Sequence, residues 1–431
     1  MRKITKNPPH SEPHLPSRPI LVLLFALYSM TGAMGMDLYL PSFHAIAHEF
    51  SVSATQVQQS ISVYMGAMAV SMLFYGTLSD TFGRRRVLLW SISGYALAAL
   101  ICSLSPNFEV LVISRLLQGL MAGSGMVVTR AMVQDLYEGA QARRMMSLVM
   151  LFFGLGPCIA PILGGILQTT FGWRSNFYFL TGFSVLLGLF AWRSLPETIA
   201  LEARTPLRLT SIGCNFLRAL GQPKFCAMAA GLGLIAGANS LYITSAAEFI
   251  MNILRMDATS FGWLFIPHVG GMMAGSTAAA ALASRMSEQW QSRFAYAGLF
   301  AAMALNIGYH MDTSAPEVPW AVLPITIYSF SVALLMPMRS IRIINFFPSM
   351  RGLASSLQAF TQMFTFAVLS SVLVPLLFHS GLALAVGHAV CTVIGMFIWW
   401  VAMRLPQEQV EEEGGMLAPV AASRDTPVRS T

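Results

Sequence analysis

The chain is divided into long apolar segments, each close to the length that a helix needs to cross a lipid bilayer. About 20 apolar residues span ~30 Å of hydrocarbon as an α-helix. We place twelve such segments, at residues 20–41, 57–78, 87–104, 110–130, 144–167, 175–195, 223–247, 260–283, 293–311, 319–339, 351–378 and 382–403. The pattern predicts an all-α membrane protein with twelve transmembrane helices.

Composition excludes a water-soluble fold. Hydrophobic residues make up 55% of the 431 residues and charged residues 10%, whereas about 25% of a soluble domain is charged. The cysteines have no paired spacing, so we expect neither disulfides nor a metal site, and no cofactor. They are Cys102, Cys158, Cys214, Cys226 and Cys391.

The basic residues predict the orientation in the membrane. If the amino terminus is cytoplasmic, the cytoplasmic segments hold all of the 26 Lys and Arg residues except Arg115, Arg174 and Arg255. This is the bias of the positive-inside rule, and an odd number of spans would destroy it. We therefore expect both termini in the cytoplasm. Because the net charge of +7 is dispersed over many short loops, no nucleic-acid partner is expected.

Two six-helix halves follow from the longest cytoplasmic connection. We predict an amino-terminal bundle over 20–195, a linker over 196–222 and a carboxy-terminal bundle over 223–405. A cytoplasmic tail precedes the first bundle (1–19), and a second tail follows the last (406–431), where the Glu, Gly, Pro and Ser content predicts disorder.

The loop between the second and third spans carries the most specific motif. Residues 76–86 read Gly-Thr-Leu-Ser-Asp-Thr-Phe-Gly-Arg-Arg-Arg. The segment resembles the signature loop of the major facilitator superfamily, G-x-L-[SA]-D-x-x-G-R-[RK], with every fixed position matched. The resemblance implies a gating group, in which we include Gly76, Asp80, Gly83, Arg84, Arg85, Arg130 and Asp135. The alternative is a loop that only anchors the topology.

Further motifs are similar to those of the Bcr/CflA group of twelve-helix drug:proton antiporters within this superfamily. They are Asp37-Leu38-Tyr39-Leu40-Pro41, Arg115-Leu116-Leu117-Gln118-Gly119, and an antiporter-type element in span five with Gly156, Pro157, Pro161, Gly164 and Gly165. The spacing before Gly156 departs from the antiporter pattern. Span five is therefore either a packing helix or a bent helix that controls rocking of the halves. The resemblance implies a monomer in a bacterial inner membrane that exchanges protons for small drug-like or amphiphilic molecules.

Two charged residues within spans carry the mechanistic hypothesis. An ionised side chain at a helix centre costs about 2.5–3.5 kcal/mol on insertion scales, so it needs a partner or a wet cavity. Asp37 and Arg115 come to similar depths near the external side. Burial favours the protonated carboxyl and a nearby guanidinium favours the carboxylate, so small movements load or release a proton. We predict Asp37 as the main proton carrier; the alternative is a structural ion pair.

Candidate residues for a substrate cavity share helix faces with these charges or lie in the second half. Methionine repacks readily around mixed apolar and polar substrates. The candidates are Met30, Met34, Gln118, Met126, Asn239, Tyr242, Gln358 and Gln362. Any polar residue among them could instead only hydrogen-bond a neighbouring helix. Glu248, near the external end of span seven, is expected to be a solvated loop residue.

These features favour a secondary transporter that exports drugs against a proton gradient. The alternative on the same scaffold is a transporter of one specific metabolite. A membrane enzyme would need a nucleophile–base pair or a metal cluster, and the sequence offers neither. A primary pump would need a G-x-x-x-x-G-K-[ST] phosphate loop, which does not occur.

Overall fold

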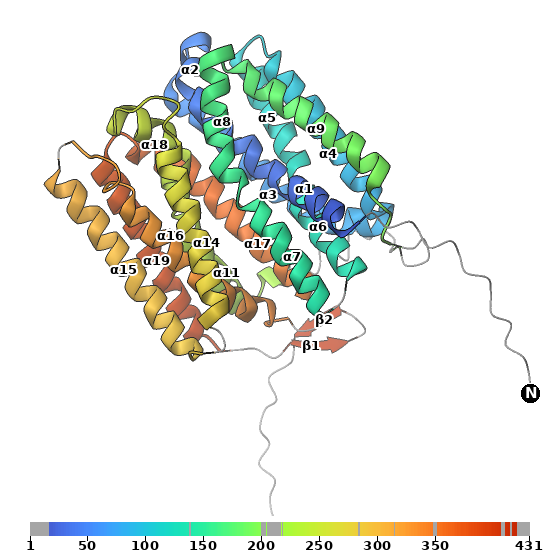
Figure 1. Cartoon of the computed structure of the whole chain (residues 1–431). Coiled ribbons are helices and arrows are strands. Elements are labelled where there is room, and N and C mark those ends of the chain that lie inside the picture. The colour runs from blue at the N-terminus through green and yellow to red at the C-terminus, as the bar shows by residue number, and fades with distance from the viewer. Residues whose placement is uncertain are drawn as a thin grey trace, which may run out of the picture.

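A computed structural model describes residues 17–137, 139–199, 204, 217, 219–282, 285–313, 315–347, 351–406, 410–413 and 416–419. Most of the linker predicted at 196–222 lies outside these residues, as does the first tail up to residue 16. The described chain is almost entirely helical, and Figure 1 shows the helices lying side by side. This is the expected all-α membrane fold.

The first half contains nine α-helices among its described residues. They are α1 (Arg18–Asp37), α2 (Phe43–Phe50), α3 (Ala54–Phe82), α4 (Arg84–Ser103), α5 (Phe108–Ala122), α6 (Ser124–Leu136), α7 (Gly139–Phe153), α8 (Gly156–Phe171) and α9 (Arg174–Ser194). A short 3-10 turn at Leu40–Ser42 joins α1 to α2.

The second half is built in the same way, with shorter pieces in two of its spans. Its helices are α11 (Pro223–Gly237), α12 (Ser240–Thr244), α13 (Ala246–Glu248), α14 (Gly262–Leu282), α15 (Glu288–Asp312), α16 (Leu323–Ile344), α17 (Arg351–Val368), α18 (Val374–Leu377) and α19 (Gly381–Arg404). Single π-helical turns at Phe249–Ile253 and Leu369–Leu373 continue two of them.

Each predicted span coincides with one helix or with consecutive helices. Eight stretches of the described residues are long and apolar enough to cross a membrane, and the arrangement is consistent with twelve crossings. Four spans are interrupted: 110–130 at Gly123, 144–167 at residues 154–155, and 223–247 and 351–378 by the short pieces of the second half.

Local sequence explains where several helices begin. Ser53 and Gln56 form a capping box at the start of α3, with the Gln56 N–H donating to Ser53 Oγ at 3.2 Å. The Asn107 side chain accepts from the Val110 N–H at 2.9 Å and caps α5. Gly83 alone separates α3 from α4. Its φ of 100° is a backbone conformation that glycine adopts without strain.

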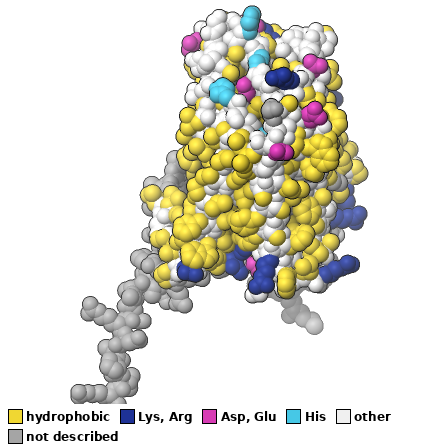
Figure 2. Space-filling model, turned by 90° about the vertical axis from the view of Figure 1, so that its left-hand side faces the viewer, with side chains coloured by type: hydrophobic (Ala, Val, Ile, Leu, Met, Phe, Trp, Pro, Cys, Tyr) yellow, Lys and Arg dark blue, Asp and Glu magenta, His cyan; other side chains and the backbone are white. Residues whose placement is uncertain are grey.

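The two ends of the molecule carry different charges. Figure 2 shows a hydrophobic belt with Lys and Arg at the lower rim and Asp, Glu and His at the upper end. We call the lower side the basic end. It holds the start of α4, α11, α15 and α17 and the end of α6, α16 and α19, which are linked by contacts such as Lys224 Nζ to the Leu405 carbonyl at 2.9 Å. The other side, with α2 and α13, is the opposite end.

The segment after α19 is not wholly disordered. β1 (Val410–Glu413) and β2 (Met416–Pro419) form an antiparallel pair in which Val410 faces Pro419. The prediction of disorder is therefore wrong for these eight residues. Gly-Gly stands between the strands in the sequence, and such a pair is a hairpin-turn signal.

Candidate functional site

Arg115 lies at the centre of a buried polar cluster in the first half. The residue is 0% exposed. Its Nη1 donates to the Gly35 carbonyl at 2.8 Å and to Gln118 Oε1 at 2.6 Å. Residues three apart in a helix share a face, so α5 presents Arg115 and Gln118 together. The first of these bonds ties α5 to α1.

Three aromatic rings enclose the Arg115 guanidinium. Its Cζ lies 4.1 Å from the Tyr64 ring centroid, 4.8 Å from that of Tyr39 and 5.9 Å from that of Phe177. Ring faces stabilise a desolvated cation. The Tyr64 hydroxyl in turn donates to the Gly32 carbonyl at 2.8 Å. This enclosure was not predicted, because the rings come from three segments that no spacing connects to Arg115.

Asp37 is the last residue of α1 and is 1% exposed. Its Oδ1 is buried and has no hydrogen-bond partner in the described part of the chain. Asp37 and Arg115 do not form an ion pair in this structure. The alternative of a structural ion pair is therefore not what joins α1 to α5 here. Arg115 also retains two buried donors without acceptors, Nε and Nη2.

Replacing Arg115 by Lys is expected to destabilise the first half. A lysine has one compact charged group on a flexible stem and cannot reproduce the planar, multiply donating guanidinium. Losing a charged hydrogen bond to Gly35 costs about 1.5–3 kcal/mol. The melting temperature of the purified protein should fall. Arg404→Lys, at an exposed residue that loses only its stacking on the Trp400 ring, should lower it much less, because an exposed cation–π contact contributes only about 0.5–1 kcal/mol. Equal melting temperatures for both variants would contradict this account.

Arg84 is the hub of a second cluster, at the basic end. Its Nε donates to Asp135 Oδ2 at 3.1 Å and its Nη1 to Ser79 Oγ at 2.6 Å, and it forms an ion pair with Asp80. Its backbone N–H donates to Glu197 Oε1 at 2.9 Å. One residue thus joins α3, α4, α6 and the segment after α9.

Glu197 was not predicted as part of this cluster, since its position assigned it to the linker. Its carboxylate accepts from the first turn of α4, where a helix favours negative charge, and lies 3.6 Å from Arg204 Nη2. A Cβ on Gly83 would come within 2.3 Å of Glu197 Oε2. Glycine therefore provides both the positive φ and the space. The sequence signal is a glutamate directly after a span.

Three other members of the predicted gating group contact partners other than Arg84. The Arg85 Nη2 donates to the Trp192 carbonyl, which ties α4 to α9. Arg130 Nη1 donates to Ser355 Oγ at 3.3 Å, so it links α6 of the first half to α17 of the second. Gly76 lies on the side of α3 that faces α6.

The carboxyl-terminal part of span five lies between the two halves. A Cβ on Gly164 would meet the Leu38 carbonyl oxygen at 2.2 Å, directly after α1. A Cβ on Gly165 would meet the Ala258 carbonyl oxygen at 2.2 Å, in the turn before α14. Two adjacent glycines thus let α8 touch the backbone of both halves.

The start of α8 marks the interruption in span five. Gly156 and Pro157 open the helix, and Pro161 lies inside it. Proline in a helix interior removes a backbone hydrogen bond and bends the helix. Gly156 faces Met30, whose Cβ would lie 3.3 Å from an added methyl group. The motif residues therefore follow one helix from the Met30 side chain to the contact between the halves.

Hydrogen bonds join the halves at the opposite end. Gln58 Nε2 on α3 donates to the carbonyl of Ser370 at 2.7 Å and to its Oγ at 2.8 Å. Ser62 Oγ lies 3.0 Å from the same Ser370 hydroxyl. These side chains are buried. The structure is therefore closed at the opposite end.

Glu248 belongs to this closure. The sequence predicted a solvated loop residue, and that prediction is wrong. Its side chain is 15% exposed and accepts from Asn252 Nδ2 at 2.7 Å. His44 Nε2 on α2 and His379 Nδ1 lie 3.9 Å and 3.7 Å from its oxygens. The prediction failed because the partners come from both halves and are distant in the sequence.

The two glutamines of α17 hold helices together. Gln358 Nε2 donates to Ser340 Oγ at 2.5 Å and Gln362 Nε2 to Met336 Sδ at 3.9 Å. Both acceptors lie on α16. These bonds agree with the alternative in which a polar residue hydrogen-bonds a neighbouring helix.

The remaining cavity candidates fall into separate groups. Asn306 Nδ2 donates to the hydroxyl of Tyr242, which is buried, at 2.8 Å. Asn239, one turn earlier, has a buried Oδ1 without a partner among the described residues. Met34 is buried, whereas Met30 and Met126 are partly buried. Among the described residues, no hydrogen bond joins the candidates of the first half to those of the second.

Comparison with known proteins places the chain among transporters. Residues 24–368 match the sequence profile of the Major Facilitator Superfamily. The chain is 31% identical over 322 residues to an uncharacterized MFS-type transporter of Bacillus subtilis (YdgK), covering 74% of this chain and 79% of that one. It is 29% identical over 355 residues to multidrug resistance protein D of Escherichia coli, covering 82% and 88%. A bicyclomycin resistance protein homologue of Haemophilus influenzae is 29% identical over 278 residues, covering 64% and 70%.

Solved structures share the fold at low sequence identity. A bacterial homologue of the human lysosomal transporter Spinster, in an inward-facing and unoccupied conformation, has a TM-score of 0.69 at 14% identity, covering 90% of this chain and 97% of that one. A D-xylose–proton symporter has a TM-score of 0.68 at 14% identity, covering 89% and 96%. At this identity the likeness concerns the fold alone.

Proposed function

Since this chain belongs to the Major Facilitator Superfamily, we propose that it is a drug:proton antiporter that works by alternating access. It is a multi-pass membrane transporter and not an enzyme. The relatives named for bicyclomycin resistance and multidrug resistance support drug efflux as its task. The observation that carries proton coupling is the buried carboxyl of Asp37, whose Oδ1 has no hydrogen-bond partner among the described residues, in the same half as an arginine with unused donors.

The proposed orientation places the basic end in the cytoplasm. Positively charged loops are retained on that side of the membrane. With twelve crossings, both termini then lie in the cytoplasm of a bacterial cell, and the protein is in the inner membrane. The opposite end, closed by the Gln58–Ser370 bonds, faces outward.

Asp37 is proposed to carry the proton in its neutral form when the opposite end is closed. A buried carboxylate without a partner is strongly disfavoured, so this environment favours the protonated acid. When the proton leaves, the Nε and Nη2 N–H groups of Arg115, which have no acceptor among the described residues, are available to donate to the carboxylate. The Gly35 bond keeps the guanidinium near α1 throughout. Release in this proposal requires the two side chains to approach each other.

Alternating access would connect this acid to each side in turn. Asp37 ends α1, and the chain then turns at Leu38 toward the opposite end. Separating the halves there would admit water and external protons. Closing that end and opening the basic end would let a substrate displace the proton inward. The Met30 and Met34 face next to Asp37 suits amphiphilic substrates, because methionine adapts its shape.

A compound panel in proteoliposomes tests the proposed function. Purified protein is reconstituted with a pH indicator inside, and unrelated toxic compounds are added one at a time. Proton movement with several unrelated compounds supports multidrug antiport. A response to one metabolite alone would indicate the specific transporter instead. No proton movement with any transported compound would refute proton coupling.

A further inference from the structure

We propose that the basic end of the second half binds the phosphate headgroup of an anionic phospholipid between the start of α15 and the end of α16. A cavity of about 820 Å³ lies there, lined by residues 287–289, 292, 293, 296, 339 and 342. A second cavity of about 400 Å³ shares Glu288 and Arg342 with it. The site is separate from the Asp37–Arg115 cluster of the first half.

Arg339 is the buried cation of this site. It is 8% exposed and lies between two rings, with Cζ 4.8 Å from the Trp399 centroid and 5.6 Å from that of Tyr296. Its Nη2 donates to Ser292 Oγ at 3.3 Å and to the Tyr296 hydroxyl at 3.2 Å. Its Nε is buried without an acceptor in the described chain. A charge in this position needs an anion.

The protein supplies too few carboxylates for the arginines that line the cavity. Arg342 pairs with Glu288 at 3.3 Å. Arg293 lies over the Trp290 ring, with Cζ 5.2 Å from its centroid. Neither Arg293 nor Arg339 forms an ion pair with a carboxylate of the described residues. Three arginines against one glutamate leave two positive charges uncompensated.

The equivalent junction in the first half shows how a compensated cluster looks. There, between α3 and α4, Arg84 forms ion pairs with Asp80 and Asp135 and its N–H binds Glu197. At the junction between α14 and α15, Glu288 at the start of α15 is the one carboxylate among the described residues that line the cavity. An external anion would complete the second cluster in the way that acidic side chains complete the first.

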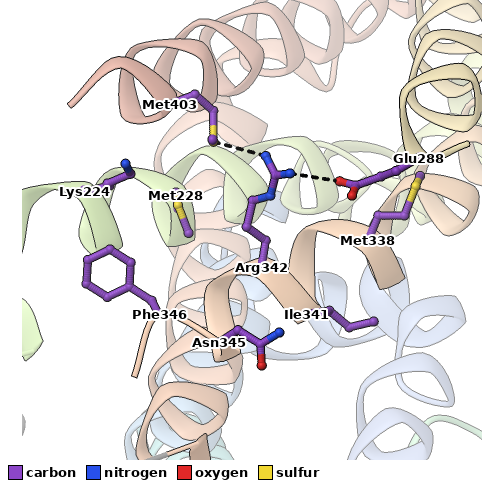
Figure 3. A pocket seen from close by; sticks show the side chains of 9 residues that line it. All are labelled: Lys224, Met228, Glu288, Met338, Ile341, Arg342, Asn345, Phe346 and Met403. Carbon is purple, nitrogen blue, oxygen red and sulfur yellow. Dashed lines mark hydrogen bonds and ion pairs between the residues drawn. The ribbon is translucent and has the colours of Figure 1, made fainter. Parts of the chain in front are cut away.

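Two features indicate how a phosphate would be held. The amino terminus of α15, a helix of 25 residues, forms one wall of the cavity. Ser287 caps the Trp290 N–H there, and a helix amino terminus attracts anions. Figure 3 shows Arg342 at the centre of the smaller cavity, with Lys224 on the far side from Glu288. Arginine binds phosphate oxygens through two parallel N–H bonds.

The surroundings favour a phospholipid over a free phosphate ion as the source of that group. The side chains of Trp290, Phe294 and Ile341 are exposed on the neighbouring surface. Figure 2, which views the side where Figure 1 draws α15, shows the basic rim directly below a hydrophobic belt. A lipid would place its headgroup at the rim and its acyl chains on the belt. Basic pockets between transmembrane helices bind such headgroups.

Lipid titration of the purified, delipidated full-length protein tests the site by native mass spectrometry. Cardiolipin and phosphatidylglycerol should bind at concentrations at which phosphatidylcholine does not. Arg339→Gln and Arg342→Gln should each weaken binding of the anionic lipids about tenfold, as expected for loss of a charged hydrogen bond. Arg342 is surface-accessible, so its variant remains informative if Arg339→Gln does not fold. Arg404→Gln, at the same end but outside both cavities, is the matched control.

Four results would overturn the proposal. Equal binding of phosphatidylcholine, or binding unchanged in both arginine variants, would exclude a headgroup site. Inorganic phosphate that binds as tightly as the lipids, with the same dependence on Arg342, would indicate a site for free anions. Lipid binding that appears only when Glu411, Glu412 and Glu413 are replaced by Gln would show that the acidic tail fills the cavity.

Discussion

Asp37→Asn is expected to reduce substrate-driven proton movement to the level of protein-free vesicles. Asparagine has nearly the same shape as aspartic acid but cannot carry a proton. Because Asp37 is buried and accepts no hydrogen bond at Oδ1, the exchange removes no contact of that oxygen. The variant should therefore fold and still bind substrates. The measurement is internal pH in proteoliposomes after addition of a compound that the unaltered protein transports.

The matched control is Asp257→Asn. Asp257 is an exposed residue of the turn before α14, also at the opposite end, so the chemical change is the same without burial. Its proton movement should equal that of the unaltered protein. Undiminished proton release by Asp37→Asn would exclude this residue as the obligatory carrier, whatever the other variants do.

The charged residues of the first half could be found from the sequence because they stand out in apolar spans. Asp37 and Arg115 are such residues, and the structure brings Arg115 within a hydrogen bond of α1. Their surroundings could not be found. Tyr64 and Phe177 are ordinary residues of two other spans, and only the packing of four helices makes them an enclosure for the guanidinium.

In the Arg84 cluster, too, contacts between residues close in the sequence are easier to predict than contacts between distant segments. Asp80 and Arg84 are four residues apart, on either side of the Gly83 turn, so their pairing needs only local chain geometry. Glu197 reaches them from beyond α9, a contact that depends on the whole bundle. Gln358, a cavity candidate, donates to Ser340 on α16, and a polar face has the same sequence pattern whether it meets water or another helix.

The fold was accessible because hydrocarbon thickness sets the length of each apolar segment. Segment length does not encode breaks within a span. The helix pairs α5–α6 and α7–α8 replace single predicted spans because the chain turns at Gly123 and at residues 154–155. In the second half, a π-helical turn at Leu369–Leu373 interrupts the span 351–378 without any glycine or proline inside the turn. Such breaks depend on tertiary packing.

Gly165→Ala is expected to shift the transporter away from the conformation closed at the opposite end. An added methyl group would stand 2.2 Å from the Ala258 carbonyl oxygen, and a backbone atom cannot rotate away as a flexible side chain can. Overpacking of this kind costs about 1–3 kcal/mol. Because the contact joins the two halves, the cost applies to the closed state. It changes the open-to-closed ratio about 5- to 150-fold.

Distances between spin labels at positions 48 and 257 would measure this shift, in a protein whose native cysteines are replaced. His48 on α2 and Asp257 are exposed residues of the two halves at the opposite end. Gly165→Ala should move the distribution to longer distances. Gly182→Ala, on α9 with nothing within 4 Å of an added Cβ, should leave it unchanged.

Gly164→Ala separates closure of the halves from general damage to α8. Its added methyl group would meet the Leu38 carbonyl oxygen at the same 2.2 Å, but within the first half. That strain is present whether the opposite end is open or closed, so it should lower the melting temperature without lengthening the label distance. If Gly165→Ala behaves like Gly164→Ala, α8 is a packing helix, and control of rocking must lie in contacts such as Gln58–Ser370.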